Sequence, residues 1–289
     1  MNNTKVGFVA FLGRPNVGKS SLINAIVGEK VSIVSPKPQT TRDKALGIYT
    51  DKDRQIIFVD TPGVHKPRTE LSEQMVGAAY TAIRDADIAV VLIDSTKPIT
   101  DTDKRLIRRS IKGTRPLIIV ITKADLGGFD MIYPLITSVS GYMSEIGFGG
   151  DYEIVPTSAR SKLNLDKLLE LLTARLPVGE LLYPEDEYTD KSTDYLIEET
   201  IREKALYLLQ EEIPHGIKVD VIKSEYTDSM VSIFADIVLE RKSHKSIVIG
   251  AGGSMLGKIG QNAREGIERL LGRKVYLKLF VKVREGWRG

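Results

Sequence analysis

The chain has 289 residues, of which 42% are hydrophobic, so it is long enough to form two domains that each bury a core. It contains no cysteine, which excludes disulfide bonds and thiolate metal sites and is compatible with a reducing cytosol. The longest apolar runs have the length of strands and are too short to cross a bilayer, so we expect a cytoplasmic protein.

The first 176 residues alternate between apolar runs of strand length and amphipathic segments of helical character. Strands are expected at 6–12, 54–60, 87–94, 116–122 and 152–158, and helices at 21–28, 72–84, 101–110 and 163–176. This alternation is typical of a mostly parallel sheet with helices on both faces. We therefore predict an α/β domain over residues 1–176.

The composition changes after this first domain. Residues 177–191 contain prolines and acidic side chains without apolar periodicity, which favours an interdomain linker. Residues 192–289 follow a different order of elements: a helix at 193–211, strands at 216–226 and 229–240, a short helix, a glycine turn, a longer helix and a strand at 274–283. This order predicts a separate α+β domain.

The positive charge of the chain is concentrated at its carboxyl-terminal end. The formal net charge is +3, and residues 1–190 are balanced, whereas residues 241–289 hold 12 basic and 3 acidic side chains. A partner that carries many negative charges would suit this end, and a solvated basic face is the alternative.

A phosphate-binding loop is predicted at 13–20, where the sequence GRPNVGKS lies between the first strand and the first helix. Glycines let backbone N–H groups wrap a phosphate, and the following helix presents its positive end. Lys19 can reach the β- and γ-phosphates, and the Ser20 hydroxyl can hold Mg²⁺. The predicted contacts are Gly13, Arg14, Pro15, Asn16, Val17, Gly18, Lys19, Ser20 and Ser21, and they indicate a nucleoside triphosphatase.

Two further segments are predicted to respond to the γ-phosphate. The sequence DTPG supplies Asp60, Thr61, Pro62 and Gly63 directly after a strand, where Asp60 can hold Mg²⁺ through water and the Gly63 N–H can meet the γ-phosphate. In the polar segment QTTRD, Thr41 is our choice for completing the Mg²⁺ shell, Thr40 is the second choice, and both could be plain loop residues.

The nucleotide base is predicted from the sequence TKAD, which follows the strand at 116–122. The Asp125 carboxylate offers two acceptors to the adjacent N1–H and N2–H₂ donors of guanine, and adenine has no such pair. The stem of Lys123 can cover one face of the base, and the residues Ser158, Ala159 and Arg160 can offer a backbone N–H to the guanine O6. These motifs, in this order, predict that the first domain binds GTP.

With these motifs placed, the chain resembles the Era family of GTPases over essentially its whole length. The resemblance is carried by GRPNVGKSSLIN, PQTTRD, DTPGVHKP and the carboxyl-terminal KVYLKLFVKVREGWR. It implies a P-loop GTPase domain followed by a type II KH domain. It also implies binding to the 3′ region of 16S ribosomal RNA, a role in 30S subunit assembly and RNA maturation, and peripheral contact with the cell membrane.

The chain departs from the common GTPase pattern at two positions. Thr122 stands where GTPases generally carry asparagine, and Val64 stands where Ras-like proteins carry the glutamine that orients water, so intrinsic hydrolysis should be slow. The resemblance further implies that Asn16 helps to seat a K⁺ ion near the phosphates; the alternative is that Asn16 only shapes the loop.

In the second domain, the resemblance to KH domains places an RNA-binding loop at GAGG, residues 250–253. Glycines let the nucleic-acid backbone approach, and an adjoining apolar groove would take splayed bases. Ile247, Val248, Ile249 and Ile259 either line this groove or pack in the core. The predicted RNA contacts are Ile249, Gly250, Ala251, Gly252, Gly253, Lys258, Ile259, Arg264, Lys242 and Lys245. Ala251 and Gly252 replace the lysine or arginine common in KH loops, which weakens phosphate contact at the tip.

Two other functions remain open at this point. The basic carboxyl-terminal end could bind anionic lipid in a membrane-associated regulatory GTPase. Alternatively, the chain could be an RNA-binding module whose GTPase domain no longer hydrolyses nucleotide, although the presence of Lys19, Ser20 and Asp60 disfavours this.

Overall fold

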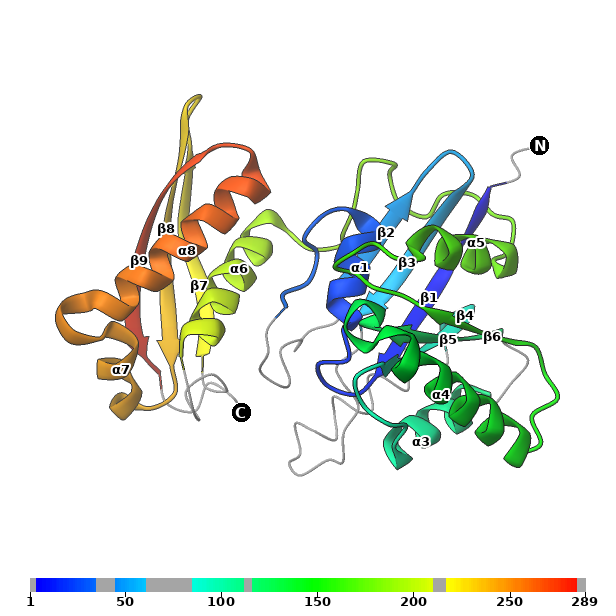
Figure 1. Ribbon diagram of the computed structural model, residues 1–289. Coiled ribbons are helices and arrows are strands. Elements are labelled where there is room, and N and C mark those ends of the chain that lie inside the picture. Colours follow the sequence, from blue (N-terminus) through cyan, green and yellow to red (C-terminus); the bar gives the residue numbers. More distant parts are fainter. Residues whose placement is uncertain (1–3, 35–44, 61–84, 112–115, 210–216, 285–289) are drawn as a thin grey trace. The chain divides into compact units, whose positions relative to one another are not determined.

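The computed structural model describes residues 4–34, 45–60, 85–111, 116–209 and 217–284 (Figure 1). The chain forms two compact units, of which the first comprises residues 1–32 and 38–190 and the second comprises residues 33–37 and 191–289. Each unit contains its own sheet, flanking helices and buried core.

The first unit is built on a six-stranded sheet of order β2-β3-β1-β4-β5-β6. Only the pairing of β2 with β3 is antiparallel, and the other four pairings are parallel. The strands are β1 (Lys5–Gly13), β2 (Ala45–Thr50), β3 (Arg54–Asp60), β4 (Ile88–Asp94), β5 (Leu117–Thr122) and β6 (Tyr152–Pro156). The mostly parallel sheet is confirmed; β2 was not among the predicted strands.

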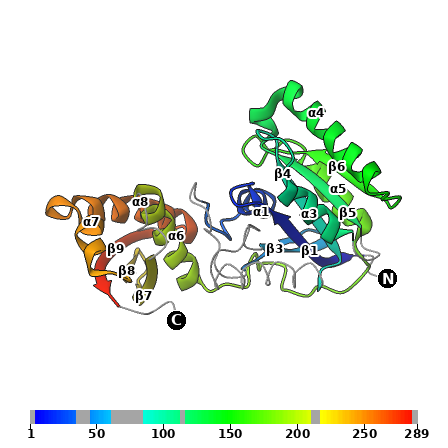
Figure 2. The ribbon, with the colours of Figure 1, turned by 90° about the horizontal axis from the view of Figure 1, so that it is seen from below.

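Helices cover both faces of this sheet, as Figure 2 shows from below. The described helices are α1 (Lys19–Val27), α3 (Asp101–Ser110), α4 (Ala124–Glu145) and α5 (Leu165–Arg175). Helices α1 and α5 bury one face, and α3 and α4 bury the other. Strands β4 and β5 are buried on both sides, which explains their continuous apolar sequences.

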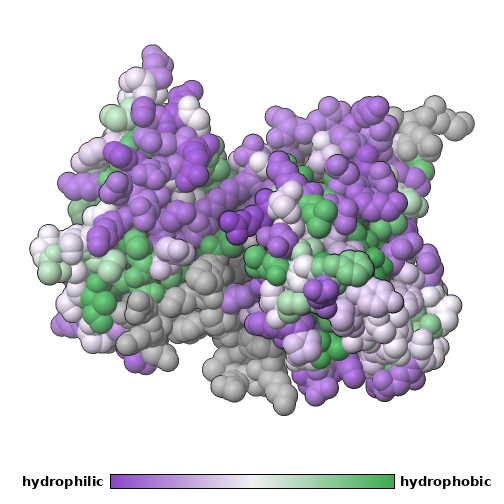
Figure 3. Space-filling view, viewed as in Figure 1, coloured by the Kyte–Doolittle hydropathy of each residue, from purple (hydrophilic) through white to green (hydrophobic). Residues whose placement is uncertain are grey.

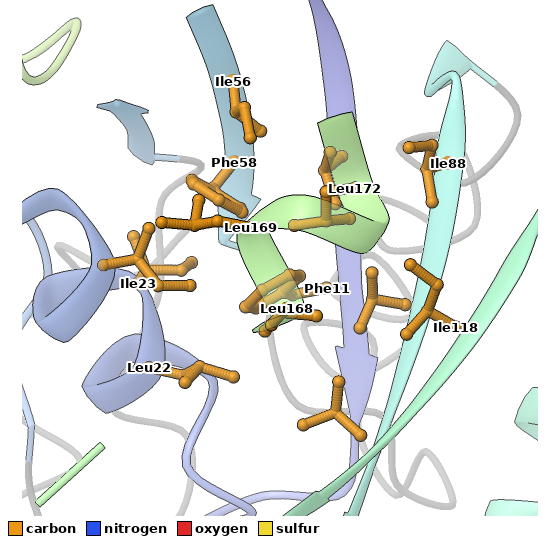
Figure 4. Close-up of a cluster of buried hydrophobic side chains, with 14 of the residues drawn as sticks. Phe11, Leu22, Ile23, Ile56, Phe58, Ile88, Ile118, Leu168, Leu169 and Leu172 are labelled. Atoms are coloured by element: carbon orange, nitrogen blue, oxygen red, sulfur yellow. The ribbon is translucent and has the colours of Figure 1, made fainter. Parts of the chain in front are cut away.

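The core between the sheet and α5 is shown in Figure 4. Leu168 of α5 lies beside Phe11 and Leu169 lies beside Phe58, and Leu172 belongs to the same buried cluster. The two rings meet edge to face with centroids 5.2 Å apart, a favoured geometry for aromatic pairs. This packing fixes the strands whose carboxyl ends carry the nucleotide-site residues.

Helix α4 was not predicted, because its sequence contains glycines and Pro134. Gly128 has φ 61° and ψ 176°, which are not helical angles, so the helical path is interrupted in its second turn. The predicted helix at 72–84 lies outside the described residues.

The segment predicted as a linker is hydrogen-bonded to the first unit as far as Asp190. The Val6 N–H donates to Pro177 O at 3.0 Å, and the Ile48 N–H donates to Tyr188 O at 2.9 Å. Midway, the buried Gln55 side chain accepts from Leu182 N at 2.8 Å and Tyr183 N at 3.0 Å. Residues 177–190 therefore lie against the first unit before the second begins.

The second unit is a three-stranded sheet with helices on one face. Strand β7 (Ile217–Tyr226) pairs antiparallel with β8 (Met230–Leu239), and β8 pairs in parallel with β9 (Lys274–Val283). Helices α6 (Thr193–Leu208), α7 (Lys245–Ile249) and α8 (Ser254–Leu271) complete the unit. This is the predicted order of elements. Among the described helices of the chain, none is both long and apolar enough to span a bilayer.

Candidate functional sites

The phosphate loop connects β1 to α1 with a tightly constrained backbone. Gly13 has no room for a side chain, because a Cβ there would lie 2.6 Å from Val17 Cγ1. Gly18 has φ 104° and caps α1, a left-handed conformation that glycine adopts without strain. Asn16 also takes a left-handed conformation, with φ 60°. These angles, together with the amino end of α1, form the kind of turn that cradles phosphate.

Lys19 is buried at the base of this loop, with 6% of its surface exposed. Its Nζ donates to Gly13 O at 3.3 Å and lies 3.5 Å from Arg14 O. Burial lowers the pKa of Lys19 below its ordinary value, and the nearby Asp60 carboxylate opposes part of that shift. A phosphate group would therefore relieve the cost of burying this charge.

The residues predicted to hold Mg²⁺ come together at the ends of α1 and β3. The Ser20 hydroxyl donates to Asp60 Oδ2 at 2.7 Å, and Asp60 is fully buried. Hydroxyl and carboxylate oxygens are the hard ligands that Mg²⁺ prefers, and Mg²⁺ commonly takes its remaining ligands from water and nucleotide phosphate. The donor set of Ser20 and Asp60 thus fits the expected metal.

Thr122 links the base-recognition segment to the phosphate loop. Its buried hydroxyl lies 2.6 Å from Val17 O and 3.2 Å from Ile93 O. A hydroxyl has one proton, so the shorter contact defines the main hydrogen bond. Thr122 therefore has a definite structural role here, because its hydrogen bond ties the phosphate loop at Val17 to the end of β5.

Lys123 and Asp125 follow at the start of α4. Lys123 Nζ forms an ion pair with Asp94 Oδ2 at 2.7 Å. Burial acts to raise the pKa of Asp94, but hydrogen bonds from Lys123 and Thr96 outweigh it, so this pKa lies below its ordinary value. The Asp125 carboxylate is exposed in the first turn of α4, where it can face a ligand. Sequence reasoning missed Asp94, although it ends a strand as Asp60 does.

The loop that contains Ser158 is joined to this segment by the backbone. Ala124 N donates to Thr157 O at 3.0 Å, and Thr157 N donates to Ile121 O at 2.8 Å. Ser158 is buried, and its hydroxyl oxygen accepts from Ser161 N at 3.0 Å. The structure thus brings together the predicted base-recognition residues around Asp125 and Ser158, while Arg160 is exposed.

A further contact fixes the phosphate loop from the side of α3. The Arg14 Nε donates to Asp103 Oδ1 at 3.0 Å, and Asp103 is fully buried. Asp103 also accepts from the backbone and hydroxyl of Thr100 in a capping box at the start of α3. Arg14 therefore has a positioning contact that the motif alone did not indicate.

Several predicted residues lie outside the described parts of the chain. They are Thr40 and Thr41 in the segment before β2, and Thr61, Pro62, Gly63 and Val64 after Asp60. Their predicted roles in holding Mg²⁺ and meeting the γ-phosphate remain predictions.

The second unit contains an open groove between α8 and β9, with a volume of about 390 Å³. Gly253 lies at the end of the groove next to the glycine loop. Gly257 and Gly260 line the groove on the side of α8, where they present no side chain. The full lining is Gly253, Leu256, Gly257, Gly260, Gln261, Arg264, Leu277, Lys278 and Leu279. Such a groove, apolar with basic side chains beside a glycine loop, suits splayed single-stranded bases.

The groove corrects part of the predicted RNA site. Ile259 is fully buried in the core of the second unit, so its role is packing, and Val248 is buried with it. Gly253 and Arg264 do line the groove, whereas Lys258, Lys242 and Lys245 are exposed outside its lining. Sequence reasoning missed Leu256, Gly257, Gly260, Gln261, Leu277, Lys278 and Leu279; the glycine spacing in GKIG was the available signal.

The glycine loop itself follows the short helix α7. Gly250 has φ 74°, and a Cβ there would lie 2.7 Å from Met255 N, so the turn into α8 requires glycine. Ile247 is 50% exposed and Ile249 is half-buried. Figure 3 shows hydrophobic residues over α7 beside a largely hydrophilic surface over α6 and α8.

Comparison with protein families gives two matches along the chain. Residues 8–123 match a family model described as 50S ribosome-binding GTPase. Residues 212–288 match the KH domain model. The two matched ranges contain the phosphate loop and the groove beside β9, respectively.

Similar curated proteins match the chain over nearly its full length. The GTPase Era of Alkaliphilus metalliredigens is 43% identical, over 98% of this chain and 95% of that protein. The GTPase Era of Trichlorobacter lovleyi is 45% identical, over 98% of this chain and 94% of that protein.

Two solved structures have the same fold over both units. A crystal structure of Era with MgGDPNP and nucleotides 1506–1542 of 16S ribosomal RNA is 41% identical, with a TM-score of 0.89 over 99% of this chain and 95% of that one. A crystal structure of a variant of Aquifex aeolicus Era bound to GDP.AlF4⁻ is also 41% identical, with a TM-score of 0.90 over 99% of this chain and 96% of that one.

Proposed function

We propose that this chain, which belongs to the Era family of GTPases, hydrolyses GTP in its first unit and binds single-stranded ribosomal RNA with its second. The observation that carries the first part is the meeting of Lys19, Ser20 and Asp60 with the Thr122–Asp125 segment at the carboxyl ends of parallel strands. Ligands bind at this edge in open α/β sheets.

Catalysis in this site consists mainly of positioning and charge neutralisation. Lys19 and the backbone N–H groups of the phosphate loop hold the β- and γ-phosphates, and water is the nucleophile. Ser20 and Asp60 would hold Mg²⁺, which would supply positive charge against the negative charge that develops on the phosphates. Thr41 and Gly63 are proposed to contact the γ-phosphate. Intrinsic hydrolysis is expected to be slow, because the side chain of Val64 cannot hydrogen-bond the attacking water.

Guanine selection is tested by Asp125→Asn. The amide replaces one acceptor with a donor, which would face a guanine donor, so we expect the affinity for GDP, as for GTP, to fall about 100-fold or more. Asp130→Asn, also exposed on α4, is the matched control. Titration of fluorescent GDP, with ATP as competitor, measures the effect; equal GDP affinity in the two variants would contradict the assignment.

Potassium use is proposed for Asn16, which lies in the phosphate loop and has a left-handed backbone conformation. A cation beside the phosphates would supply the positive charge that an arginine finger supplies in other GTPases. Phosphate release should be faster in K⁺ than in Na⁺ buffer for the parent protein, and Asn16→Ala should remove the difference. Equal rates in both buffers would end this proposal.

RNA binding is proposed for the groove between α8 and β9. The 16S ribosomal RNA 3′ region present in the related Era complex gives the RNA to test, and a role in 30S subunit assembly and RNA maturation follows from family membership. Crosslinking in cells followed by RNA sequencing should enrich the 3′ end of 16S ribosomal RNA. Uniform recovery along that RNA would argue against specific recognition.

For the domains, we propose that residues 1–176 bind GTP, 177–191 connect the domains, and 192–289 bind RNA. We also propose a cytoplasmic location. Peripheral membrane contact through the basic end is the second candidate, supported by the excess of basic residues in 241–289. Sedimentation with vesicles containing phosphatidylglycerol, with and without single-stranded RNA as competitor, separates lipid from RNA binding.

A further inference from the structure

The face of the second unit's sheet that is turned away from its helices carries an ordered pattern of side chains. Along β9, residues alternate between half-buried or buried positions on the helix side and exposed positions on the other. The exposed residues alternate basic and aromatic character in the order Lys274, Tyr276, Lys278, Phe280 and Lys282. We call these five residues the β9 stripe.

The aromatic rings of the β9 stripe are accessible and partly held in place. Tyr276 is 49% exposed and Phe280 is 42% exposed. Phe234 on β8 meets the Tyr276 ring edge to face with centroids 6.3 Å apart. Lys278 Nζ lies 5.4 Å from the centroid of the Phe280 ring. Exposing aromatic rings to water is unfavourable, and a partner with planar aromatic groups, such as nucleic-acid bases, can stack on them.

The charge on this face is positive where the rings lie. Lys282 pairs with Asp236 at 2.6 Å, so its charge is balanced. Lys218 pairs with Asp220 at 2.7 Å on β7. In the described ranges, by contrast, Lys274 and Lys278 form no ion pair with an acidic side chain. Two uncompensated ammonium groups therefore alternate with the two exposed rings.

The β9 stripe is continuous with the groove. Strand β9 is the outermost strand of its sheet, pairing with β8. Lys278 belongs to the stripe and also lines the groove with Leu277 and Leu279. Tyr276 and Phe280 each lie two residues from Lys278 along β9. Single-stranded RNA in the groove can therefore reach both rings by crossing the edge of β9.

We propose that the β9 stripe is a second contact surface for the single-stranded RNA that occupies the groove, an inference that rests on the proposed RNA-binding function. Bases outside the groove stack on Tyr276 and Phe280. The phosphate between these bases contacts Lys278, and a phosphate beyond Tyr276 contacts Lys274. Stacking on aromatic side chains tolerates any base, so the stripe extends the binding site without adding sequence preference.

The test compares two RNAs that share the same core. A four-nucleotide RNA matches the length that a glycine loop of this class clamps, and a second RNA adds four nucleotides at each end. The parent protein should bind the longer RNA more tightly. Tyr276→Ser combined with Phe280→Ser should weaken the longer RNA by about tenfold or more and leave the short RNA unchanged.

Three further variants sharpen the result. Tyr207→Ser removes a tyrosine on α6 that is 69% exposed and should change neither affinity. Tyr276→Phe keeps a ring and should bind the longer RNA as the parent does. Where the double variant does not fold, the lysine variant that follows tests the stripe. Lys274→Gln should reduce the salt slope for the longer RNA by about 0.7, because one phosphate contact is lost.

Two results would overturn the proposal: equal affinity of the parent for both RNAs, or unchanged affinity of the Ser variants for the longer one. Loss of binding to phosphatidylglycerol vesicles with RNA affinity intact would assign the stripe to lipid instead. Failure of the parent protein to bind the short RNA would contradict the proposal that the groove binds RNA. This outcome is distinguishable from the two results that would contradict the role of the β9 stripe.

Discussion

Thr122 shows how one hydroxyl can connect two parts of a binding site. Its bond to Val17 O ties the carboxyl end of β5 to the residue before Gly18, across a sequence separation of 105 residues. The threonine side chain also lies under the phosphate loop, since a Cβ on Gly18 would be 3.9 Å from Thr122 Cβ. The phosphate and base segments are therefore positioned relative to each other by this side chain.

Replacing Thr122 by valine tests this role, because valine keeps the shape and removes the hydroxyl. We expect the buried Val17 carbonyl to lose its partner at a cost of about 1–3 kcal/mol, and GDP affinity to fall about tenfold. Thr122→Ser keeps the hydroxyl and is the control. Fluorescent GDP titration and urea unfolding measure the two effects; parental GDP affinity in Thr122→Val would show that the tether is dispensable.

At the residue scale, the motifs indicated side chains that the structure brings close together, as the bond from Ser20 to Asp60 shows. The roles of Lys19, Ser20 and Asp60 toward phosphate and Mg²⁺ stay predictions. Sequence reasoning could not decide between groove and core for Ile259, because the helical spacing of apolar residues is the same in both cases. Asp103 was missed because its contact with Arg14 joins residues 89 positions apart.

At the scale of elements, Glu198 joins α6 to β7. Its Oε1 accepts from Val221 N at 2.8 Å, where the register of β7 shifts. Burial raises the pKa of Glu198 above its ordinary value of 4.5, and the nearby carboxylates of Asp220 and Asp194 raise it further. The hydrogen bond from Val221 N and the charge of Lys218 lower this pKa but do not cancel the increase. The folded protein therefore binds this proton more tightly than the unfolded chain does.

The sign of the pH effect follows from this shift. The stability that Glu198 contributes is greatest below pH 4.5 and is lost as the pH rises through the raised pKa. Glu198→Gln keeps the acceptor for Val221 and removes the charge, so the variant should gain stability relative to the parent at pH 7.5 but not at pH 4.5. Urea midpoints at both pH values test this, with the exposed Glu225→Gln as control; lower stability of Glu198→Gln at pH 7.5 would contradict it.

Gln55 holds the segment 177–190 against the first unit. Besides the two bonds that it accepts, its Nε2 donates to Tyr183 O at 2.8 Å and to Thr50 Oγ1 at 3.0 Å. Gln55→Leu should leave three backbone groups of the segment without their partner, at about 1–3 kcal/mol for each one that stays buried. Cleavage by chymotrypsin after Leu182 should become faster.

The control for this experiment is Thr50→Val, which removes only one of the four bonds and does not touch the segment. Its cleavage rate should match the parent. Equal protection of the segment in Gln55→Leu and the parent would show that the remaining bonds, from Val6 and Ile48, are sufficient.

Most elements could be predicted because each has a clear period or boundary. The ranges of β3, α3 and β9 agree with the prediction, and α3 begins with a capping box that the sequence shows. Helix α4 could not be predicted because Gly127, Gly128 and Pro134 oppose a helix locally, and packing against the sheet outweighs them. Strand β2 is six residues long and has no sharp boundary signal.

At the scale of the whole molecule, the two units have separate cores, and a functional coupling between them must appear as a difference in binding free energy. If the GTP state changes RNA affinity by some factor, RNA must change GTP affinity by the same factor. We expect a factor of about 5–150 between GDP and a non-hydrolysable GTP analogue.

Isothermal titration of RNA into each nucleotide state, and of each nucleotide into the RNA complex, measures both sides of this cycle. Agreement of the two factors would establish the coupling. RNA affinities that are identical in the GDP and GTP-analogue states would show that the units act independently.

Strand β9 lies at the end of its sheet, so one side of its backbone can accept a strand from another molecule. Lys274 and Lys278, which form no ion pair with an acidic side chain in the described ranges, place like charges along that border, and two copies brought side by side would repel each other. The same ammonium groups would therefore limit self-association. Neutralising both lysines at once should lower the solubility of the protein at low ionic strength.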